Sequence, residues 1–348
     1  MYRVLGAATI AGLLCLVLTP LLIRLLKRRE YGQFIREDGP QAHYTKQGTP
    51  TMGGILIVLS TVVAYLLLSS RTPEGLAVMG TMVACGLLGF IDDFTQIRHK
   101  RSLGLKPSVK FLGQVAIALG FTLLATHYAY QASPVLPTQL SFLGNTAVNL
   151  GWFFFIWVFI MITATTNAVN LTDGLDGLAA GSMILVMAAY MLIAFTMFRH
   201  PISEHANFYK FTGQPALDIA IICGAVLGAC VGFLWWNAAP ARIFMGDTGS
   251  LALGGVLASV AIMTRTQFLL IPLGGLFVIE AASVIIQVGV FKLTGGKRVF
   301  RMAPIHHHFE LKGWSEFTVL VRLWIVCGFC VLVGFAIFYV DFVTRVPK

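Results

Sequence analysis

The sequence predicts an all-α integral membrane protein with about ten transmembrane helices. Hydrophobic residues make up 57% of the 348 residues, whereas charged residues make up only 11%. A soluble domain carries about 25% charged residues, so this composition indicates repeated crossings of a bilayer rather than one soluble core. The mean hydropathy of +0.80 and the separation of apolar runs by short polar loops support the same fold class.

Each expected helix is an apolar run that approaches the roughly 20 residues needed to cross the hydrocarbon core. The first run precedes its basic residues and lacks a cleavage site of small residues, so we expect a retained helix and not a signal peptide. The eighth run is the shortest. The spans are expected near residues 4–26, 52–70, 76–94, 109–126, 151–169, 178–198, 217–236, 250–264, 268–291 and 317–340.

The distribution of Lys and Arg predicts how the helices are oriented. Most of these residues follow the first, third, seventh and ninth spans, and the positive-inside rule places those loops in the cytoplasm. The loop after the fifth span carries no Lys or Arg and takes its side from the alternation. Both termini are therefore expected outside (periplasmic), together with the connection 127–150, whose composition permits a short β-hairpin.

Composition also narrows the class of partner. The net charge of +10 would suit nucleic acid, but the basic residues alternate with the membrane spans. This arrangement favours membrane lipids and anionic ligands and no nucleic acid. The six cysteines lie in apolar runs and indicate small buried side chains rather than disulfides. Because no long linker or internal repeat is visible, residues 1–348 are predicted to form a single domain.

Two charges fall inside predicted spans, Glu280 in the ninth and Arg322 in the tenth. A charge at membrane depth is costly unless it is paired or exposed to water. The two residues therefore either pair with each other, which is the interpretation we favour, or mark a functional pathway.

Polar clusters gather on the predicted cytoplasmic side, and the first is the loop after the first span. It contains Lys46, Gly48 and Thr51, which offer a cation, backbone N–H groups and hydroxyls to an anion. Thr51 also suits a helix N-cap, which is the alternative interpretation.

The third span ends in Asp92 and Asp93. Adjacent carboxylates repel each other, so their retention at a membrane edge predicts a divalent cation or a cationic partner that compensates them.

The fifth span ends in Asn170, Asp173 and Asp176, each three residues apart. On a helix or in its first turn they would share a face and form an oxygen-rich site suited to Mg²⁺. Helix capping by Asp173 or Asp176 is the alternative and would account for only one of the acids.

The segment Phe244–Ser250 places Asp247 between Gly246 and Gly249, before the eighth span. An acid at a membrane edge is a functional candidate. The glycines permit a tight turn and close approach of a ligand. A polar turn between two helices would have the same composition.

Three consecutive histidines, His306, His307 and His308, follow the ninth span. Successive helical positions differ by about 100°, so the three cannot easily bind one metal. We expect one or two to contact an anionic ligand and the third to be structural, because nearby Lys and Arg residues add positive potential for phosphate.

These residues together resemble the phospho-N-acetylmuramoyl-pentapeptide-transferase family, within the polyprenyl-phosphate N-acetylhexosamine-1-phosphate transferase superfamily. The resemblance covers essentially the whole chain. The acidic motifs are shared across the superfamily, whereas the triple histidine and the GTPTMGG run at residues 48–54 resemble the family in particular. Gln96 stands where some relatives carry Lys, so no cationic role is assigned there.

The resemblance implies transfer of phospho-N-acetylmuramoyl-pentapeptide from UDP-N-acetylmuramoyl-pentapeptide to undecaprenyl phosphate, giving lipid I and UMP with Mg²⁺ as cofactor. It implies a multi-pass protein of the bacterial cytoplasmic (inner) membrane with its active site at the cytoplasmic face. Asp247 would bind the metal, Asp92 would activate the acceptor, and Asp93 would complete the catalytic acids. The implied substrate-binding residues are Lys46, Thr51, Asn170, Asp173, Asp176, Phe244 (stacking on uracil), Gln287, His306 and His307.

Two other functions are compatible with the sequence. A sister transferase that uses UDP-N-acetylglucosamine would carry the same acidic motifs. A secondary transporter would use the break near Gly246–Gly249 for substrate binding at mid-membrane. The polar clusters lie at one face and not at the midplane, which favours an enzyme. A homodimer is compatible with the sequence, which does not determine the oligomeric state.

Overall fold

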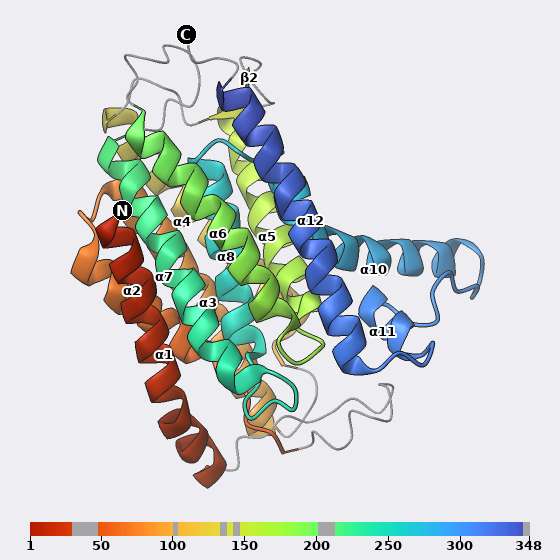
Figure 1. Ribbon diagram of the computed structural model, residues 1–348. Helices are drawn as coiled ribbons and strands as arrows, with labels where there is room; N and C mark the ends of the chain where they lie inside the picture. Colours follow the sequence, from red (N-terminus) through yellow and green to blue (C-terminus); the bar gives the residue numbers. More distant parts are fainter. Residues whose placement is uncertain (30–47, 100–103, 133–137, 142–146, 201–212, 344–348) are drawn as a thin grey trace.

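The computed structural model describes residues 1–29, 48–99, 104–132, 138–141, 147–200 and 213–343. They form a bundle of long helices (Figure 1). The helices are α1 (Tyr2–Arg28), α2 (Gly54–Leu68), α3 (Pro73–His99), α4 (Pro107–Ala132), α5 (Phe154–Thr172), α6 (Leu178–Arg199), α7 (Gly213–Asn237), α8 (Gly246–Met263), α9 (Leu270–Leu273), α10 (Gly275–Leu293), α11 (Ile305–Glu310) and α12 (Glu316–Val343).

Nine helices of the described residues are long and apolar enough to cross a membrane, and they correspond to nine of the ten predicted spans. The remaining predicted span, at 52–70, corresponds to α2, an apolar helix of 15 residues. It cannot extend further toward the N-terminus because Met52 has a φ of +73°, outside the helical region, and the Gly53 N–H donates to the Phe244 carbonyl at 2.9 Å.

The predicted span 268–291 is broken in the structure. The helix α9 ends at Leu273 and α10 begins at Gly275. Pro272 and the two glycines that follow are the poorest helix formers, which accounts for the break. Beyond it, α10 points away from the bundle, with α11 beside it (Figure 1).

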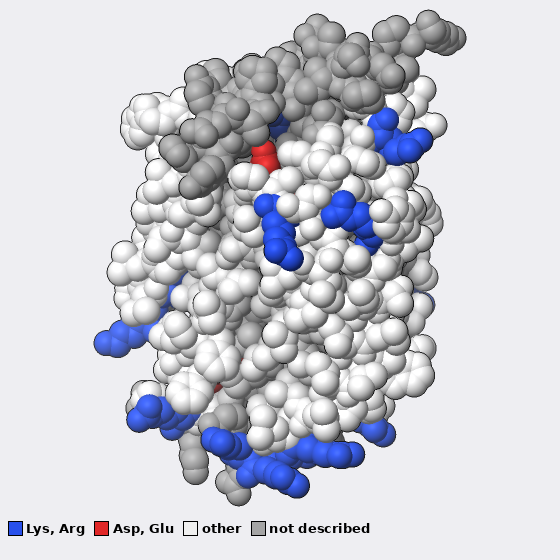
Figure 2. All heavy atoms as spheres, turned by 90° about the vertical axis from the view of Figure 1, so that its left-hand side faces the viewer, with Lys and Arg blue, Asp and Glu red and all other residues white. Residues whose placement is uncertain are grey.

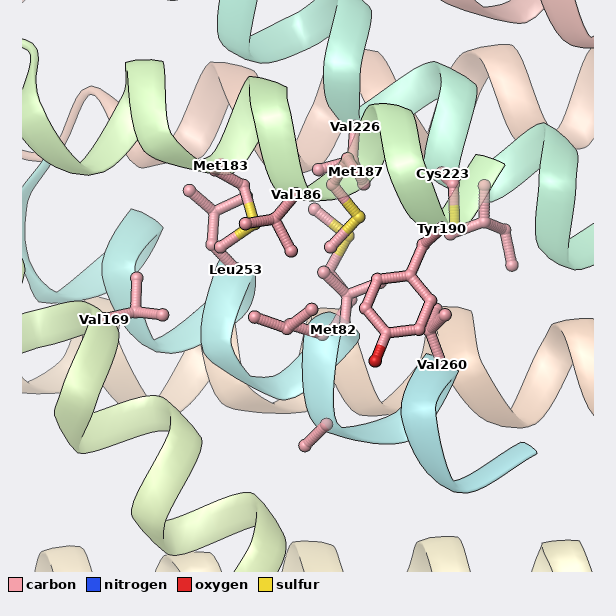
Figure 3. Packing of buried hydrophobic residues seen from close by; sticks show 14 of the residues in the cluster. Met82, Val169, Met183, Val186, Met187, Tyr190, Cys223, Val226, Leu253 and Val260 are labelled. Atoms are coloured by element: carbon pink, nitrogen blue, oxygen red, sulfur yellow. The ribbon is translucent and has the colours of Figure 1, made fainter. Parts of the chain in front are cut away.

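The centre of the bundle is α8, in which every residue from Thr248 to Met263 is buried. A helix that is apolar all round is suited to such a position. Helices α3 and α5 pack on α8, and α1 and α6 pack on α7. Figure 3 shows the core where these helices meet, with Met82, Val169, Met183, Val186, Met187, Tyr190, Cys223, Val226, Leu253 and Val260 labelled.

A short hairpin precedes α5, so the structure is not purely helical. Strand β1 (Gln139–Ser141) pairs antiparallel with β2 (Ala147–Asn149), and η2 (Gly151–Phe153) is a turn of 3-10 helix before α5. This confirms the hairpin expected in the connection 127–150.

The two ends of the bundle differ in which helices begin or end there. Helix α1 begins and α12 ends at the top of Figure 1, whereas α3 and α5 end and α8 begins at the opposite end. Figure 2 shows Lys and Arg side chains gathered mainly toward the lower end of one face, with a broad zone of uncharged side chains across the middle. Because α3 and α5 end where α8 begins, the acidic motifs that these helices carry meet at one end of the bundle (Figure 1).

Candidate active site

Asp247 lies in the first turn of α8, after a loop whose path is set by backbone pairing. The Phe244 N–H donates to the Pro50 carbonyl at 2.8 Å, which holds this loop against the segment before α2. Gly246 has a φ of +74°, and a Cβ there would come within 2.6 Å of Asp93 Oδ2. Only glycine suits such a position. The sequence Gly246-Asp247 therefore turns the chain sharply and places the carboxylate at the end of the bundle where α8 begins.

Asp93 caps the N-terminus of α8. Its Oδ1 accepts the Asp247 N–H at 3.0 Å, and its Oδ2 accepts the Thr248 N–H at 2.9 Å and the Thr248 hydroxyl at 2.6 Å. A carboxylate at this position satisfies free N–H groups and interacts favourably with the helix dipole. These contacts give Asp93 a structural role, whereas the sequence placed it among the catalytic acids.

Helices α3 and α8 approach closely enough for this capping because of Gly89. A Cβ at Gly89 would clash with the Asp247 backbone carbonyl. Glycine at such a contact lets two backbones come together. The local sequence of α3 therefore determines the distance between the acids of α3 and the start of α8.

Lys110, in the first turn of α4, lies between Asp92 and Asp247. Its Nζ is 2.6 Å from Asp247 Oδ2 and 3.5 Å from Asp92 Oδ2. The Asp92 side chain is only 4% exposed and that of Asp247 19%. In such a shielded position the attraction between opposite charges is stronger than in water. Lys110 is thus the cationic partner that the adjacent acids predicted.

Sequence reasoning missed the role of Lys110, which is one of several basic residues that follow the third predicted span. The signal was present, because a lysine in the first turn of an apolar span needs a counterion. What the sequence did not contain was the identity of that counterion, 137 positions further along the chain.

The carboxylates of Asp92 and Asp247 are also fixed by neutral donors. Asp92 accepts the Leu105 N–H at 2.8 Å and the Gln96 amide at 2.8 Å. Asn170, from the last turn of α5, donates from Nδ2 to Asp247 Oδ1 at 2.7 Å. Gln96 therefore acts as a hydrogen-bond donor to Asp92, which agrees with leaving it without a cationic role.

The shared face predicted for Asn170, Asp173 and Asp176 is only partly present. Helix α5 ends at Thr172, so Asp173 is its C-cap and Asp176 lies in the following turn and not on a helix. Burial and the negative charges of Asp247, Asp93 and Asp176 raise the pKa of Asp173 well above its ordinary value. Asp173 therefore lies within electrostatic range of the acid cluster, which is formed by Asp92, Asp93 and Asp247, and its surroundings disfavour its charged form.

Asp176 is turned to another part of the fold. Its Oδ2 accepts the Ala241 N–H at 2.9 Å, which holds the loop between α7 and α8. The prediction that Asn170, Asp173 and Asp176 form one helical face is wrong at Asp176, because the chain leaves the helix before reaching it.

Two further predicted substrate contacts border the acids. Thr51 is buried, and its hydroxyl would lie 2.9 Å from a Cβ at Gly246. Phe244 is partly exposed in the loop before α8. Lys46 lies outside the described residues.

The first histidine of α11 is buried beside the turn that carries the acids. His306 Nδ1 is 3.0 Å from Glu280 Oε2, and both side chains are completely buried. A Cβ at Gly174 would clash with His306 Nε2, so the ring lies directly against the turn after Asp173. The structure thus brings His306 to the edge of the cluster.

The favoured pairing of Glu280 with Arg322 is wrong. Glu280 pairs with His306, while the Arg322 guanidinium lies over the Trp314 ring at 4.1 Å from its centroid. The break in the predicted ninth span explains the difference, because it turns α10 so that Glu280 meets α11.

The other residues of this region serve local contacts. His307 Nδ1 is 2.7 Å from Glu310 Oε2, and His308 Nδ1 accepts the Arg301 N–H at 3.0 Å. Gln287 Oε1 accepts the Val299 and Phe300 N–H groups at 3.1 and 2.9 Å, which orders the chain after α10. Within the described residues, Gln287 makes no hydrogen bond to the acid cluster.

The acid cluster has the chemistry of an open Mg²⁺ site. The described residues contain no group of three or more His, Cys, Asp or Glu side chains able to hold a metal by themselves. Mg²⁺ commonly takes one or two carboxylates and completes its octahedron with water and phosphate oxygens. The carboxylates of Asp247 and Asp92 lie within hydrogen-bond reach of each other and offer such hard oxygens. The donor set therefore fits Mg²⁺ that is shared with a phosphate ligand.

This arrangement of a lysine between two acids, at one end of a helical bundle, is suited to phosphoryl transfer. That reaction needs cations against the charge of the transferred group and a nucleophile held in line. The cluster offers Lys110 as a cation in contact with the carboxylates of both Asp247 and Asp92.

Known proteins match the chain over nearly its whole length. Residues 75–265 match the glycosyl transferase family 4 profile, and residues 46–58 match phospho-N-acetylmuramoyl-pentapeptide-transferase signature 1. A phospho-N-acetylmuramoyl-pentapeptide-transferase of Streptomyces griseus is 50% identical over 357 residues, covering 99% of this chain and 100% of the relative.

Proteins of the same name from other bacteria match equally well. The one from Frankia casuarinae is 51% identical over an alignment of 354 positions that covers 99% of each chain. The one from Thermobifida fusca is 49% identical over an alignment of 353 positions that covers 99% of this chain and 100% of the relative. With half of its residues identical over the full length of these relatives, the chain belongs to the phospho-N-acetylmuramoyl-pentapeptide-transferase family.

Proposed function

We propose that the protein transfers phospho-N-acetylmuramoyl-pentapeptide from its UDP carrier to undecaprenyl phosphate, releasing UMP and forming lipid I for peptidoglycan synthesis. The single observation that carries this proposal is the contact of Lys110 with both Asp247 and Asp92, at 2.6 and 3.5 Å. A cation between two acids can neutralise part of the charge of an anionic donor. Its place at one end of a membrane bundle would let the donor arrive from water and the lipid acceptor arrive from the bilayer.

The reaction exchanges one phosphoanhydride bond for another. An oxygen of the lipid phosphate attacks the phosphorus that bears the sugar. The bond from that phosphorus to the oxygen bridging to UMP breaks, and UMP leaves. Lys110 lies where it would stabilise the negative charge that spreads over the transferred group.

Asp247 is the residue that would hold Mg²⁺, with Asp92 close enough to share it. When bound, the metal would neutralise the diphosphate of the donor. Asn170 orients Asp247 through its 2.7 Å hydrogen bond, which keeps one carboxylate oxygen in a fixed direction.

Asp92 is suited to activate the acceptor. Its carboxylate is held by the Leu105 N–H and the Gln96 amide, so it cannot rotate away from Lys110. In this role it would take the proton of a singly protonated lipid phosphate. We favour direct attack by the lipid phosphate, which is itself a competent anionic nucleophile, over a covalent aspartyl-phosphate.

The nucleotide-sugar would occupy the surface at Phe244 and Asp173, with the buried Thr51 and His306 beneath it. Phe244 is partly exposed beside the cluster and is suited to stack on uracil. His306 and its buried partner Glu280 would support the Asp173 turn from behind. Lys46 is proposed to contact the donor from the loop before Gly48.

The same proposal includes the membrane arrangement. The protein would lie in the bacterial cytoplasmic membrane, with both termini outside and the acid cluster at the cytoplasmic face. The alternation of the basic loops supports this orientation.

Competition between sugar nucleotides on the purified protein tests the proposed substrate. UMP release with undecaprenyl phosphate should require UDP-N-acetylmuramoyl-pentapeptide, and UDP-N-acetylglucosamine should neither react nor compete at similar concentration. Turnover of UDP-N-acetylglucosamine would assign the chain to the sister activity. Failure of both nucleotides with folded protein would refute a transferase.

A further inference from the structure

Arg322 lies on the lipid-facing stripe of α12. The helix exposes Ile325, Phe329 and Leu332 to 53, 65 and 64%. These residues follow Arg322 at spacings of three, seven and ten, so all four lie on one side of the helix. Arg322 is itself exposed. An unneutralised charge on such a stripe is costly, so the fold must provide or recruit a partner.

The depth of Arg322 corresponds to the headgroup region of a bilayer. Helix α12 has 28 residues. It is therefore about 42 Å long, which exceeds a hydrocarbon core of about 30 Å. Arg322 lies about 9 Å from the Glu316 end, close to the boundary of the core. Helical side chains lean toward the N-terminus, so its guanidinium reaches toward the headgroups beyond Glu316.

An aromatic platform holds the guanidinium and leaves its edge free. Arg322 lies over the Trp314 ring at 4.1 Å from the centroid, and Trp314 stacks on Phe309 at 4.7 Å. The Trp314 ring therefore contacts both Arg322 and Phe309. Within the described residues Arg322 has no hydrogen bond or ion pair. Its N–H groups are therefore available to a ligand, and the planar guanidinium fork matches phosphate.

The charges around this platform are also positive. Arg301 and Lys312 lie close enough to act, together with burial, to lower the pKa of His308. The nearby acids are directed elsewhere. Glu310 contacts His307 at 2.7 Å, and Glu316 accepts the Asp176 N–H at 3.3 Å.

We propose that Arg322 and Trp314 form a binding site for the phosphate of an anionic phospholipid in the leaflet at the Glu316 end of α12. The acyl chains lie along the apolar stripe that begins at Ile325. Charge complementarity selects the anion, and the exposed apolar side chains below Arg322 select a lipid over a soluble phosphate.

The occupant is a bilayer phospholipid and not the polyprenyl phosphate acceptor. Trp324 packs against α6, where a Cβ at Gly181 would clash with its ring, and a Cβ at Gly177 would lie 3.7 Å from it. Arg322 is about 200° from Trp324 around the helix, so it faces away from the turn that carries the acids. A phosphate bound there is separated from Asp247 by α12 itself.

Native mass spectrometry of the purified chain, titrated with phosphatidylglycerol, tests the site. Arg322→Gln should raise the dissociation constant of the tightest-bound phosphatidylglycerol about tenfold, the effect of losing one charge-assisted hydrogen bond. Arg322→Lys, which keeps the charge and loses the planar fork, should raise this dissociation constant by about threefold. Phosphatidylethanolamine should bind both variants and the wild type alike.

Arg24→Gln is the matched control, because Arg24 is an exposed arginine on lipid-facing α1 with no ring beneath it in the described part of the chain. It should change the affinity less than twofold. Equal losses for Arg24→Gln and Arg322→Gln would replace the site by a general charge effect and overturn the proposal. Unchanged binding in Arg322→Lys and Arg322→Gln would also overturn it. Displacement of the bound lipid by undecaprenyl phosphate, with this competition lost in Arg322→Gln, would assign the site to the acceptor instead.

Discussion

The ammonium group of Lys110 lies 2.6 Å from Oδ2 of Asp247, although the two residues begin different helices. Lys110 lies in the first turn of α4 and Asp247 in the first turn of α8. The pair joins these helices at the end of the bundle where α3 and α5 end. Asp92 lies 3.5 Å from the same ammonium group. One lysine therefore serves two carboxylates, and among the described residues no other cation contacts either of them.

Lys110→Met should reduce kcat by at least about a hundredfold, on the scale of losing one fixed electrostatic group. Lys110→Arg should keep part of the rate, because it retains the charge with a different reach. UMP release from purified variants is the measurement. A rate for Lys110→Met within about threefold of wild type would mean that the cation serves only the fold.

Asp247→Asn should abolish Mg²⁺-dependent turnover while the protein still folds, since the amide keeps the size but loses the anionic charge that a hard cation needs. We expect at least about a hundredfold loss in kcat. Glu74→Gln is the control, because it removes a buried carboxylate from the other end of α3. Near-normal activity of Asp247→Asn at ordinary Mg²⁺ would move the ligand role to another acid.

Asp92→Asn should regain much of its lost rate as the pH rises from about 6 to 9, because the second pKa of a phosphate monoester is near 6 and its dianion needs no base. A covalent nucleophile would show no such recovery, since an amide cannot form an acyl phosphate. The pH–rate profile of this variant separates the two mechanisms. Stoichiometric UMP release without lipid acceptor, with phosphate retained on the wild-type protein, would instead establish the covalent route.

Asp93→Asn should destabilise the fold by about 1–3 kcal/mol, because an amide cannot accept all the donors that reach the carboxylate. The measurement is thermal unfolding in detergent, combined with Thr248→Val in a double-mutant cycle. The two changes should couple, since Thr248 donates twice to Asp93. If Asp93→Asn unfolds like the wild type but loses its activity, the acid is catalytic and capping is secondary.

Cysteines at Lys297 and Val148 test the orientation, in a background with Cys330→Ser. Both positions are exposed, and they lie after α10 and in β2. A membrane-impermeant maleimide added to intact cells should label position 148 at once and position 297 only after permeabilisation. The reverse pattern would place the acid cluster outside.

The sequence by itself determined the apolar spans and their approximate limits, because these properties depend on local composition. Hydrophobic runs and the Lys and Arg bias need no knowledge of which helices touch. The acids Asp92 and Asp247 and the amide of Asn170 were also recognisable, since each is a polar group at a membrane edge. The hairpin before α5 followed from composition alone.

The tertiary structure decided which charge meets which. Asp92 and Asp93 are neighbours in the chain, yet one faces Lys110 and the other caps α8, because adjacent positions on a helix point about 100° apart. The break at Gly274 turns Glu280 toward His306 and leaves Arg322 on the surface. Such pairings depend on the relative placement of helices far apart in the sequence, and local patterns carry no record of that placement.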